Sequence, residues 1–194
     1  VVSNARTIPL PQATMSASQD QIIDVVDTTP PVITCPVNVT VTCGESTDPS
    51  ATGSATATDN CDATPSVTLN QTTTKGTDPE QCSFYNYTIT RTWTADDGCG
   101  NTSTASQTIN VEDTTPPVIS GLPGPSNIEC SGTPSWTTPT ATDNCGVPTL
   151  NFADVTTNGS CPNEYSITRT WTADDGCGNT ATASQTINVD DTVP

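Results

Sequence analysis

The sequence contains no histidine and only four lysine and arginine residues against 21 aspartate and glutamate residues, giving a formal net charge of −17 at pH 7. Without histidine, neither a Ser-His-Asp nor a Cys-His nucleophile system can form, so we expect no enzymatic activity. A surface this acidic repels nucleic-acid phosphates and anionic lipid. We therefore expect no nucleic-acid partner and an affinity for cations.

Long apolar runs are also missing, and no stretch approaches the roughly 20 residues that cross a bilayer, so we expect no membrane insertion. Hydrophobic residues make up 31% of the chain and aromatic residues 4%, so each folded unit buries a small core and needs further support. The chain starts without Met or a signal peptide, which favours a mature secreted chain or an excerpt of a longer one.

The nine cysteines suggest what supports the small core. Because no CxxC pair and no histidine are present, we favour disulfides over a zinc site. Disulfides persist in oxidising surroundings, which predicts an extracellular or cell-surface location.

Comparing the sequence with itself reveals two repeats. ITRTWTADDGCGNTSTASQTINV at 89–111 recurs at 167–189 with a single change, Ser103 to Ala181. TATDNC and DTTPPVI also occur twice, at 56–61 and 140–145 and at 27–33 and 113–119. We therefore predict an N-terminal extension at 1–26, a first module at 27–112, and a second module at 113–194 that includes the start of a further linker.

Within each module, apolar residues alternate with polar ones, as in Val37, Val39 and Val41 and again in Ile89 and Trp93. This two-residue period predicts strands, and the turn sequences TDNCDATP, KGTDPE and DDGCGN separate them. No segment has helical periodicity. We expect an all-β fold of two tandem immunoglobulin-like β-sandwich modules preceded by an extended N-terminal strand segment.

The motifs DTTPPVITCP, TATDNC and WTADDGCGNT carry a resemblance to a known class of module. Through them, residues 27–194 resemble the hyalin-repeat-like and immunoglobulin-like tandem modules of large bacterial cell-surface and adhesin proteins. The resemblance implies a structural or adhesive array rather than catalysis. The second module departs from the pattern at GLPGPSNIEC, residues 121–130, which has no counterpart of Cys35.

Strand directions predict which cysteines meet, because a disulfide requires Cα atoms within about 7 Å of each other. Tracking the strands places Cys43 and Cys82 at one end of the first module, and Cys61 and Cys99 at the other. The expected disulfides are Cys43–Cys82, Cys61–Cys99 and, by alignment, Cys130–Cys161 and Cys145–Cys177. Sequence alone leaves three connectivities per module. Cys35 is left over, either as a buried free thiol or as a bond to another chain.

The same tracking gathers oxygen-bearing side chains at the entry end of each module. Oxygen ligands from several separated positions suit Ca²⁺, which takes about six to eight of them. The expected ligands are Asp27, Asp59, Asn60, Asp96, Asp97 and Asn101 in the first module, and Glu112, Asp113, Asp143, Asn144, Asp174, Asp175 and Asn179 in the second. Alternatively, these are ordinary solvated turn residues.

Two further features bear on assembly. Pro30–Pro31 and Pro116–Pro117 favour extended backbone and predict stiff connections between modules. Glycan modification is possible at the sequons of Asn38, Asn70, Asn86, Asn101 and Asn158.

The extension contains a copy of a module's last strand, since QIIDVVDTTPPVI at 21–33 matches QTINVEDTTPPVI at 107–119. In this alignment Gln21, Ile23 and Val25 take core-facing positions, and a free strand of this pattern leaves an unpaired edge. The preceding module is absent from the recorded chain, or the strand folds back on its own module, or it contacts a neighbouring subunit as a donated strand.

We expect a structural subunit of an extracellular, pilus- or fibre-like filament, because a head-to-tail contact that does not close builds a homopolymer. In this view the N-terminal strand joins subunits, and disulfides and junction calcium stiffen them. One alternative is a stalk segment of a large cell-surface adhesin. A carbohydrate- or protein-binding module would need an aromatic platform, and Trp136 is the only spare tryptophan.

Overall fold

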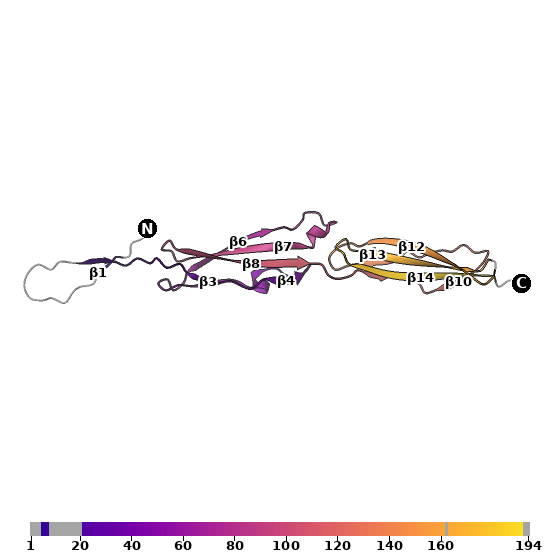
Figure 1. Cartoon of the computed structure of the whole chain (residues 1–194), viewed down its shortest axis with the longest axis horizontal. Helices are drawn as coiled ribbons and strands as arrows, with labels where there is room; N and C mark the ends of the chain where they lie inside the picture. The colour runs from indigo at the N-terminus through magenta and orange to yellow at the C-terminus, as the bar shows by residue number, and fades with distance from the viewer. Residues whose placement is uncertain (1–4, 8–20, 162, 192–194) are drawn as a thin grey trace, which may run out of the picture. The chain divides into compact units, whose positions relative to one another are not determined.

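The computed structural model describes residues 5–7, 21–161 and 163–191, and strands dominate these residues (Figure 1). The only helices among them are the single turn α1, Pro49–Thr52, and the 3-10 turn η1, Cys82–Phe84. The prediction of an all-β fold with two immunoglobulin-like sandwich modules is confirmed. Abundant Thr and short alternating apolar residues favour strands over helices here.

The first repeat forms a small and a large sheet. In the small sheet, β3 (Val32–Thr34) pairs antiparallel with β5 (Thr56–Thr58). The large sheet has the strand order β4-β8-β7-β6. Its strands span Val39–Thr42 for β4, Ser66–Thr73 for β6, Tyr87–Asp96 for β7 and Thr102–Glu112 for β8.

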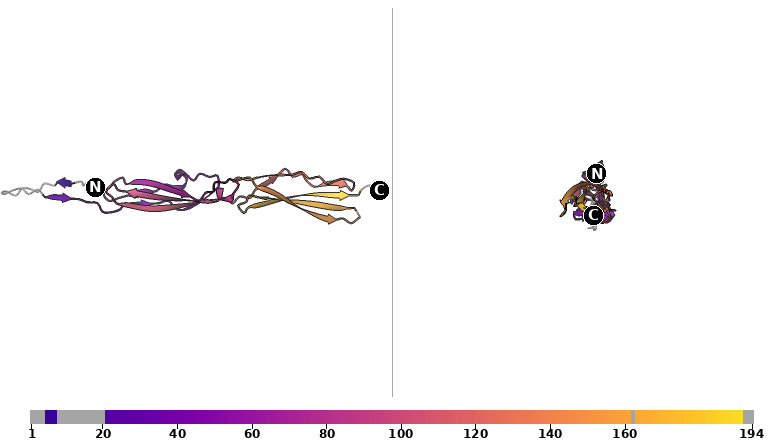
Figure 2. Two further views of the ribbon diagram at one scale, coloured as in Figure 1. Left: turned by 90° about the horizontal axis from the view of Figure 1, so that it is seen from above. Right: turned by 90° about the vertical axis from the view of Figure 1, so that its right-hand side faces the viewer.

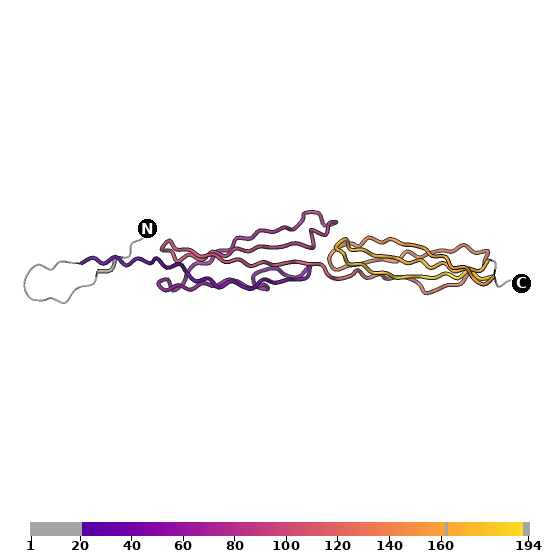
Figure 3. Tube along the Cα trace, in the orientation of Figure 1, coloured from indigo at the N-terminus to yellow at the C-terminus, as the bar shows by residue number. Residues whose placement is uncertain are grey.

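The second repeat has the same layout. Its small sheet pairs β9 (Val118–Ser120) with β11 (Thr140–Thr142), and its large sheet has the order β10-β14-β13-β12. These strands span Ser126–Glu129 for β10, Thr149–Asn158 for β12, Tyr165–Asp174 for β13 and Thr180–Asp190 for β14. Strand β10 runs parallel to β14, whereas β12, β13 and β14 form an antiparallel meander that is easily followed in the Cα trace of Figure 3.

By its internal contacts the chain divides into two compact units that do not coincide with the predicted modules. The first unit comprises residues 1–39, 47–72 and 90–109, and the second comprises residues 40–46, 73–89 and 110–194. The second unit therefore combines the whole second repeat with residues 40–46, 73–89 and 110–112 of the first repeat.

Each core follows from the alternation of the two longest strands. In the first repeat, Trp93 and Ala95 from β7 and Ile109 from β8 are buried, and the equivalent residues of β13 and β14 are buried in the second. Gln107 is buried as well, because its side-chain amide donates hydrogen bonds to the carbonyls of Val37 at 3.1 Å and Thr52 at 2.7 Å. The hydrogen bonds offset the cost of burying this polar group.

In the described part of the N-terminal extension, residues 5–7 pair with residues 22–24. Strand β1 (Ala5–Thr7) pairs antiparallel with β2 (Ile22–Asp24), as the left view of Figure 2 shows. Ile23 is 45% exposed and Val25 is 70% exposed, and Gln21 is exposed too. Within the described part of the chain, Ile23 and Val25 therefore do not face a core.

Candidate functional site

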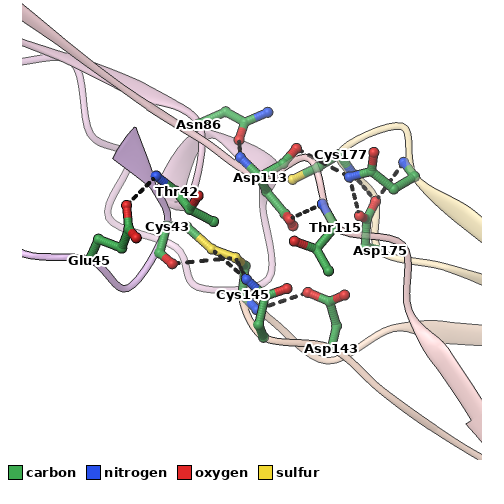
Figure 4. The surroundings of a disulfide bond; sticks show 12 residues. Thr42, Cys43, Glu45, Asn86, Asp113, Thr115, Asp143, Cys145, Asp175 and Cys177 are labelled. Carbon is green, nitrogen blue, oxygen red and sulfur yellow. Dashed lines mark hydrogen bonds between the residues drawn. A yellow bond between two sulfur atoms is a disulfide. The ribbon is translucent and has the colours of Figure 1, made fainter. Parts of the chain in front are cut away.

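Two disulfides in the second unit connect the first sequence repeat to the second. Cys43, directly after β4, bonds to Cys145 after β11, with their Cα atoms 5.9 Å apart. Cys82, in η1, bonds to Cys177, with their Cα atoms 5.0 Å apart. Both separations are normal for a disulfide. Figure 4 shows the Cys43–Cys145 bond among carboxylates of the second repeat.

The predicted pairing within modules is therefore contradicted. The strand directions were right, because Cys43 and Cys82 do lie at the end of the first repeat and Cys145 and Cys177 at the start of the second. The bonds form across the repeats instead, between Cys43 and Cys145 and between Cys82 and Cys177.

Among the described residues, the other five cysteines form no disulfide. They are Cys35, Cys61, Cys99, Cys130 and Cys161. Cys35 is half-buried, and burial raises the pKa of its thiol. Four of the eight cysteines expected to pair within modules are thus unpaired in a single chain.

Apolar side chains surround the Cys43–Cys145 bond. Val111 is buried against it, with Val41, Tyr85 and Tyr87 packed around this cluster. Tyr85 also lies over Gly146, where an added Cβ would sit 3.1 Å from the tyrosine ring. A larger residue at Gly146 would push the ring away, so the close approach depends on glycine.

A frame of hydrogen bonds fixes Asp113, the first residue of the linker motif (Figure 4). Its backbone N–H donates to Oδ1 of Asn86 at 2.6 Å, and its carbonyl accepts from Nδ2 of Asn179 at 3.1 Å. Nδ2 of Asn179 also donates to Oδ2 of Asp175 at 2.7 Å. The frame thereby ties the end of the first repeat to the DDGCGN turn of the second.

The carboxylates of the second repeat are held close enough to interact. Asp113 is only 4% exposed, and burial together with the charges of Asp143 and Asp175 raises the pKa of its carboxyl group. Burial also disfavours the charged form of Asp175, but hydrogen bonds from Asn179 and the Cys177 N–H outweigh it, so this pKa is lowered. The site thus concentrates negative charge in a poorly solvated place.

The equivalent carboxylates of the first repeat form a tighter cluster. Oxygen atoms of Asp27, Asp59 and Asp97 lie within 4.8 Å of one another. Hydrogen bonds from Asn101 lower the pKa of Asp97, and backbone N–H groups of Asp62 and Cys61 lower that of Asp59. Both groups are therefore held in the charged form that a cation would bind.

Three carboxylate oxygens in these clusters are buried without a hydrogen-bond partner among the described residues. They are Oδ2 of Asp27, of Asp59 and of Asp143. A buried, unsatisfied carboxylate oxygen is costly, and a bound cation removes that cost. A hard, oxygen-preferring ion therefore fits these residues. The sulfurs of Cys43 and Cys145 beside Asp113 are not ligands, because they are bonded to each other.

The structure gives other roles to the remaining predicted ligands. Asn101 and Asn179 donate hydrogen bonds that position carboxylates, and Asp96 and Asp174 accept from the backbone within their own turns. The amides of Asn60 and Asn144 donate to the sulfurs of the following cysteines, and Glu112 is exposed. Of the predicted ligands, Asp27, Asp59 and Asp97 lie together in the first repeat, and Asp113 interacts with Asp143 and Asp175 in the second.

Trp136 does not form an open aromatic platform. The guanidinium of Arg169 lies 4.6 Å from its ring centre and 3.8 Å from that of Phe152. Arg169 also forms an ion pair with Asp154 at 2.7 Å. The tryptophan is part of a packed stack, which weakens the carbohydrate-binding alternative.

Sequence reasoning missed Asn86 and Tyr85, although both contact the second repeat. Both lie in the loop between β6 and β7, where the second repeat is shorter. Tyr85 and Asn86 lie in a stretch where the two repeats differ in length, and that difference is visible in the sequence.

Comparison with known proteins supports the repeat assignment. Residues 118–189 match the family model described as HYR-like domain with 4 cysteines. Hyalin from the sea urchin Lytechinus variegatus is 35% identical over 189 residues, a match that covers 87% of this chain and 33% of hyalin. The chain thus spans about a third of the length of this curated relative.

Solved structures of tandem modules are also similar in part. The N-terminal Ig1-2 module of the Drosophila receptor protein tyrosine phosphatase DLAR is 17% identical, with a TM-score of 0.28, covering 84% of this chain and 100% of that one. The human desmocollin-1 ectodomain is 12% identical, with a TM-score of 0.31, covering 94% and 46% respectively. These low scores carry no argument about function.

The two immunoglobulin-like modules are therefore similar to hyalin repeats, through the match of residues 118–189 and through the likeness to hyalin. The bacterial origin suggested by the motifs finds no support, since the relative comes from a sea urchin. Among the described residues, no helix is both long and apolar enough to span a membrane.

Proposed function

We propose that the chain is a non-catalytic structural subunit of an extracellular filament, assembled head to tail from copies of itself. The observation that carries the proposal is the pair of disulfides Cys43–Cys145 and Cys82–Cys177, which connects one repeat to the next. Such bonds would hold consecutive modules of an extended array together when the array is pulled. Disulfides of this kind also support a location outside the cytosol.

Strand β2 supplies the contact between copies in this proposal. Ile23 and Val25 are exposed, although their counterparts in β8, Ile109 and Val111, are fully buried. A second copy offers an edge for β2 at β12, one of the two edge strands of its large sheet, where Val155 is 62% exposed. Strand addition would bury these apolar side chains and pair the free backbone groups of both edges.

We further propose that Ca²⁺ binds the carboxylate clusters and stiffens the connection between repeats. The buried, unpartnered oxygens of Asp27, Asp59 and Asp143 support this, as does the net charge of −17. Carboxylates from the linker and two turns would then share one ion. Burial is the main cause of the raised pKa of Asp113, and cation binding would relieve the added repulsion from Asp143 and Asp175.

Electron microscopy of the purified chain tests the assembly. The full chain should form filaments in the presence of Ca²⁺, and a chain lacking residues 1–26 should remain dispersed while keeping its circular dichroism spectrum. Filaments formed by the truncated chain would rule out strand donation.

A matched pair of point variants tests the acceptor edge. Val155→Asp on β12 should prevent filament formation, whereas Thr72→Asp on β6 should not. Thr74 pairs with Thr88 in the first repeat as Thr157 pairs with Ser166 in the second. Thr72 and Val155, each two residues earlier, therefore occupy corresponding positions. Equal effects of the two substitutions would contradict the choice of β12.

A stalk segment of a longer adhesive protein is the second candidate. It is favoured by the relative's length, since the match covers 33% of hyalin. In that case the same purified chain should appear as isolated particles at every calcium concentration.

A further inference from the structure

Cys61 and Cys99 at the start of the first repeat are held in the same way as Cys145 and Cys177 at the start of the second. The N–H of Cys61 donates to Oδ1 of Asp59 at 2.8 Å, and that of Cys145 donates to Asp143 at 2.8 Å. The N–H of Cys99 likewise donates to Asp97 at 2.8 Å, and that of Cys177 to Asp175 at 2.7 Å. The start of the first repeat is thus a second copy of a site that already accepts two disulfides.

The surrounding frame is repeated as well. Nδ2 of Asn101 donates to the carbonyl of Asp27 at 3.2 Å, as Asn179 does to Asp113 at 3.1 Å. Oδ1 of Asp27 accepts from the Thr29 N–H at 3.0 Å, just as Asp113 accepts from Thr115 at 3.2 Å. These matches show that the cysteines of the first repeat are preorganised like those that are bonded in the second.

The half of the bonded site that contains Cys43 and Cys82 also has a counterpart, at the end of the second repeat. The N–H of Cys130 donates to the carbonyl of Asp190 at 3.0 Å, as that of Cys43 does to Glu112 at 3.1 Å. Cys161 lies in the loop before β13, as Cys82 lies in the loop before β7. Cys130 and Cys161 are exposed and form no disulfide within the chain.

We propose that Cys130 and Cys161 of one copy bond to Cys61 and Cys99 of the next copy, reproducing the bonds Cys43–Cys145 and Cys82–Cys177 between chains. This inference rests on the proposed head-to-tail assembly and names its covalent contact. Strand β2 ends close to Asp27 in sequence, so the same end of the chain carries both the donated strand and these two thiols.

The chemistry requires an external oxidant, for which a small-molecule disulfide such as oxidised glutathione suffices. Each contact converts four thiols into two sulfur–sulfur bonds and releases four protons and four electrons. Two molecules of the small disulfide accept these and leave as four thiols, so that atoms and electrons balance.

Two sequence differences distinguish the contact between copies from the one within the chain. Tyr85 lies against Gly146 within the chain, and by alignment Asn163 takes the place of Tyr85 and Asp62 that of Gly146. The contact between copies is therefore more polar than the internal one. It should open first when a reductant is added.

Two complementary variants test the proposal. Of these four thiols, the double variant Cys130→Ser/Cys161→Ser keeps only those of Cys61 and Cys99. The double variant Cys61→Ser/Cys99→Ser keeps only those of Cys130 and Cys161. Mixed in chelator with oxidised glutathione, they should give a disulfide-bonded heterodimer that neither variant forms alone, with peptides joining Cys61 to Cys130 and Cys99 to Cys161. Peptide mapping of the internal bonds confirms that each variant is folded.

The outcomes separate this inference from the proposed assembly. A Cys61–Cys99 bond within one chain, or dimers of a single variant, would overturn the inference. So would wild-type filaments that lack the two inter-copy peptides, although the filament proposal would then survive. A heterodimer with the expected peptides supports the inference even where no filament forms, and then strand donation fails instead.

Discussion

Cys43 and Cys145 lie 102 residues apart in sequence, and a disulfide holds their Cα atoms 5.9 Å apart. Val111, the last core residue of β8, is buried against this bond. The bond therefore lies inside a packed cluster and joins the end of one repeat to the first turn of the next. The bond adds a covalent connection between the two repeats to the one that the main chain already provides.

Removing this bond should destabilise the chain markedly. In the chain-entropy model, closing a loop of this length contributes about 4–5 kcal/mol, so Cys43→Ser/Cys145→Ser should lower the free energy of unfolding by up to that amount. Denaturant unfolding followed by tryptophan fluorescence measures the change. Cys35→Ser, which removes a thiol that forms no disulfide, should have little effect. Equal stability of the two variants would contradict the role given to the Cys43–Cys145 bond.

Calcium should stabilise the chain at neutral pH. Ligand binding to the folded state adds about 2.7 kcal/mol when free Ca²⁺ is roughly 100-fold above its dissociation constant. Calorimetric titration into chelator-treated protein should show binding, and Asp59→Asn should weaken it at the first repeat. Asp78→Asn, in the loop between β6 and β7, is the control. No heat at any concentration would contradict the calcium proposal.

The raised pKa of Asp113 predicts a pH dependence with a definite sign. Its folded-state pKa lies above the unfolded value, so the folded state holds the proton more tightly. When a chelator keeps calcium away, the contribution of Asp113 to the free energy of unfolding should therefore fall as the pH rises from the usual aspartate pKa through the raised one. Asp113→Asn keeps the acceptor for Thr115 and should abolish this component of the pH dependence.

The contradictory result is equally specific. If wild type and Asp113→Asn lose stability in parallel over that pH range, the raised pKa assigned to burial of Asp113 and to the charges of Asp143 and Asp175 is contradicted. Added Ca²⁺ should reverse the difference between the two proteins, because the ion favours the charged carboxylate.

Arg91 and Arg169 occupy the same position of the two repeats but should differ in importance. Arg91 is buried and donates hydrogen bonds to Thr52, Gln107 and the Thr47 carbonyl. Arg91→Leu leaves these acceptors unsatisfied and should cost about 3 kcal/mol or more. Arg169→Leu should cost less in denaturant unfolding, because its partner Asp154 is solvated. A larger loss for Arg169→Leu would contradict this assignment.

The ion pair between Arg169 and Asp154 implies a definite pH dependence for the carboxyl group of Asp154. A hydrogen bond from Arg169 lowers the pKa of Asp154, so this contribution to stability is present above the usual aspartate pKa and is lost as pH falls through the lowered one. Arg169→Gln should return the pKa of Asp154, followed by NMR, to its usual range. An unchanged pKa would contradict the pairing.

The strands could be predicted from the sequence because alternation is a local property. β7 and β8 follow the alternation of Ile89 to Ala95 and of Gln107 to Val111, which fixes one buried face. The gathering of Asp27, Asp59 and Asp97 could also be predicted, since strand direction places turn residues at one end of a module.

The disulfide partners could not be predicted in this way. Strand direction places Cys43 and Cys82 at the same end, but a choice of partner depends on what that end contacts. The contact with the second repeat is made by Tyr85 and Asn86 in an irregular loop, whose course no periodic pattern encodes. The role of Asn179 as a positioning donor has the same origin, because it depends on a carbonyl 66 residues away.

Peptide mapping of the non-reduced protein tests the central claim most directly, because the two disulfides between consecutive repeats carry the proposed function. Digestion and mass spectrometry should recover peptides that join Cys43 to Cys145 and Cys82 to Cys177. Peptides that join Cys43 to Cys82 and Cys145 to Cys177 would show that each repeat is closed on itself, and would contradict the account.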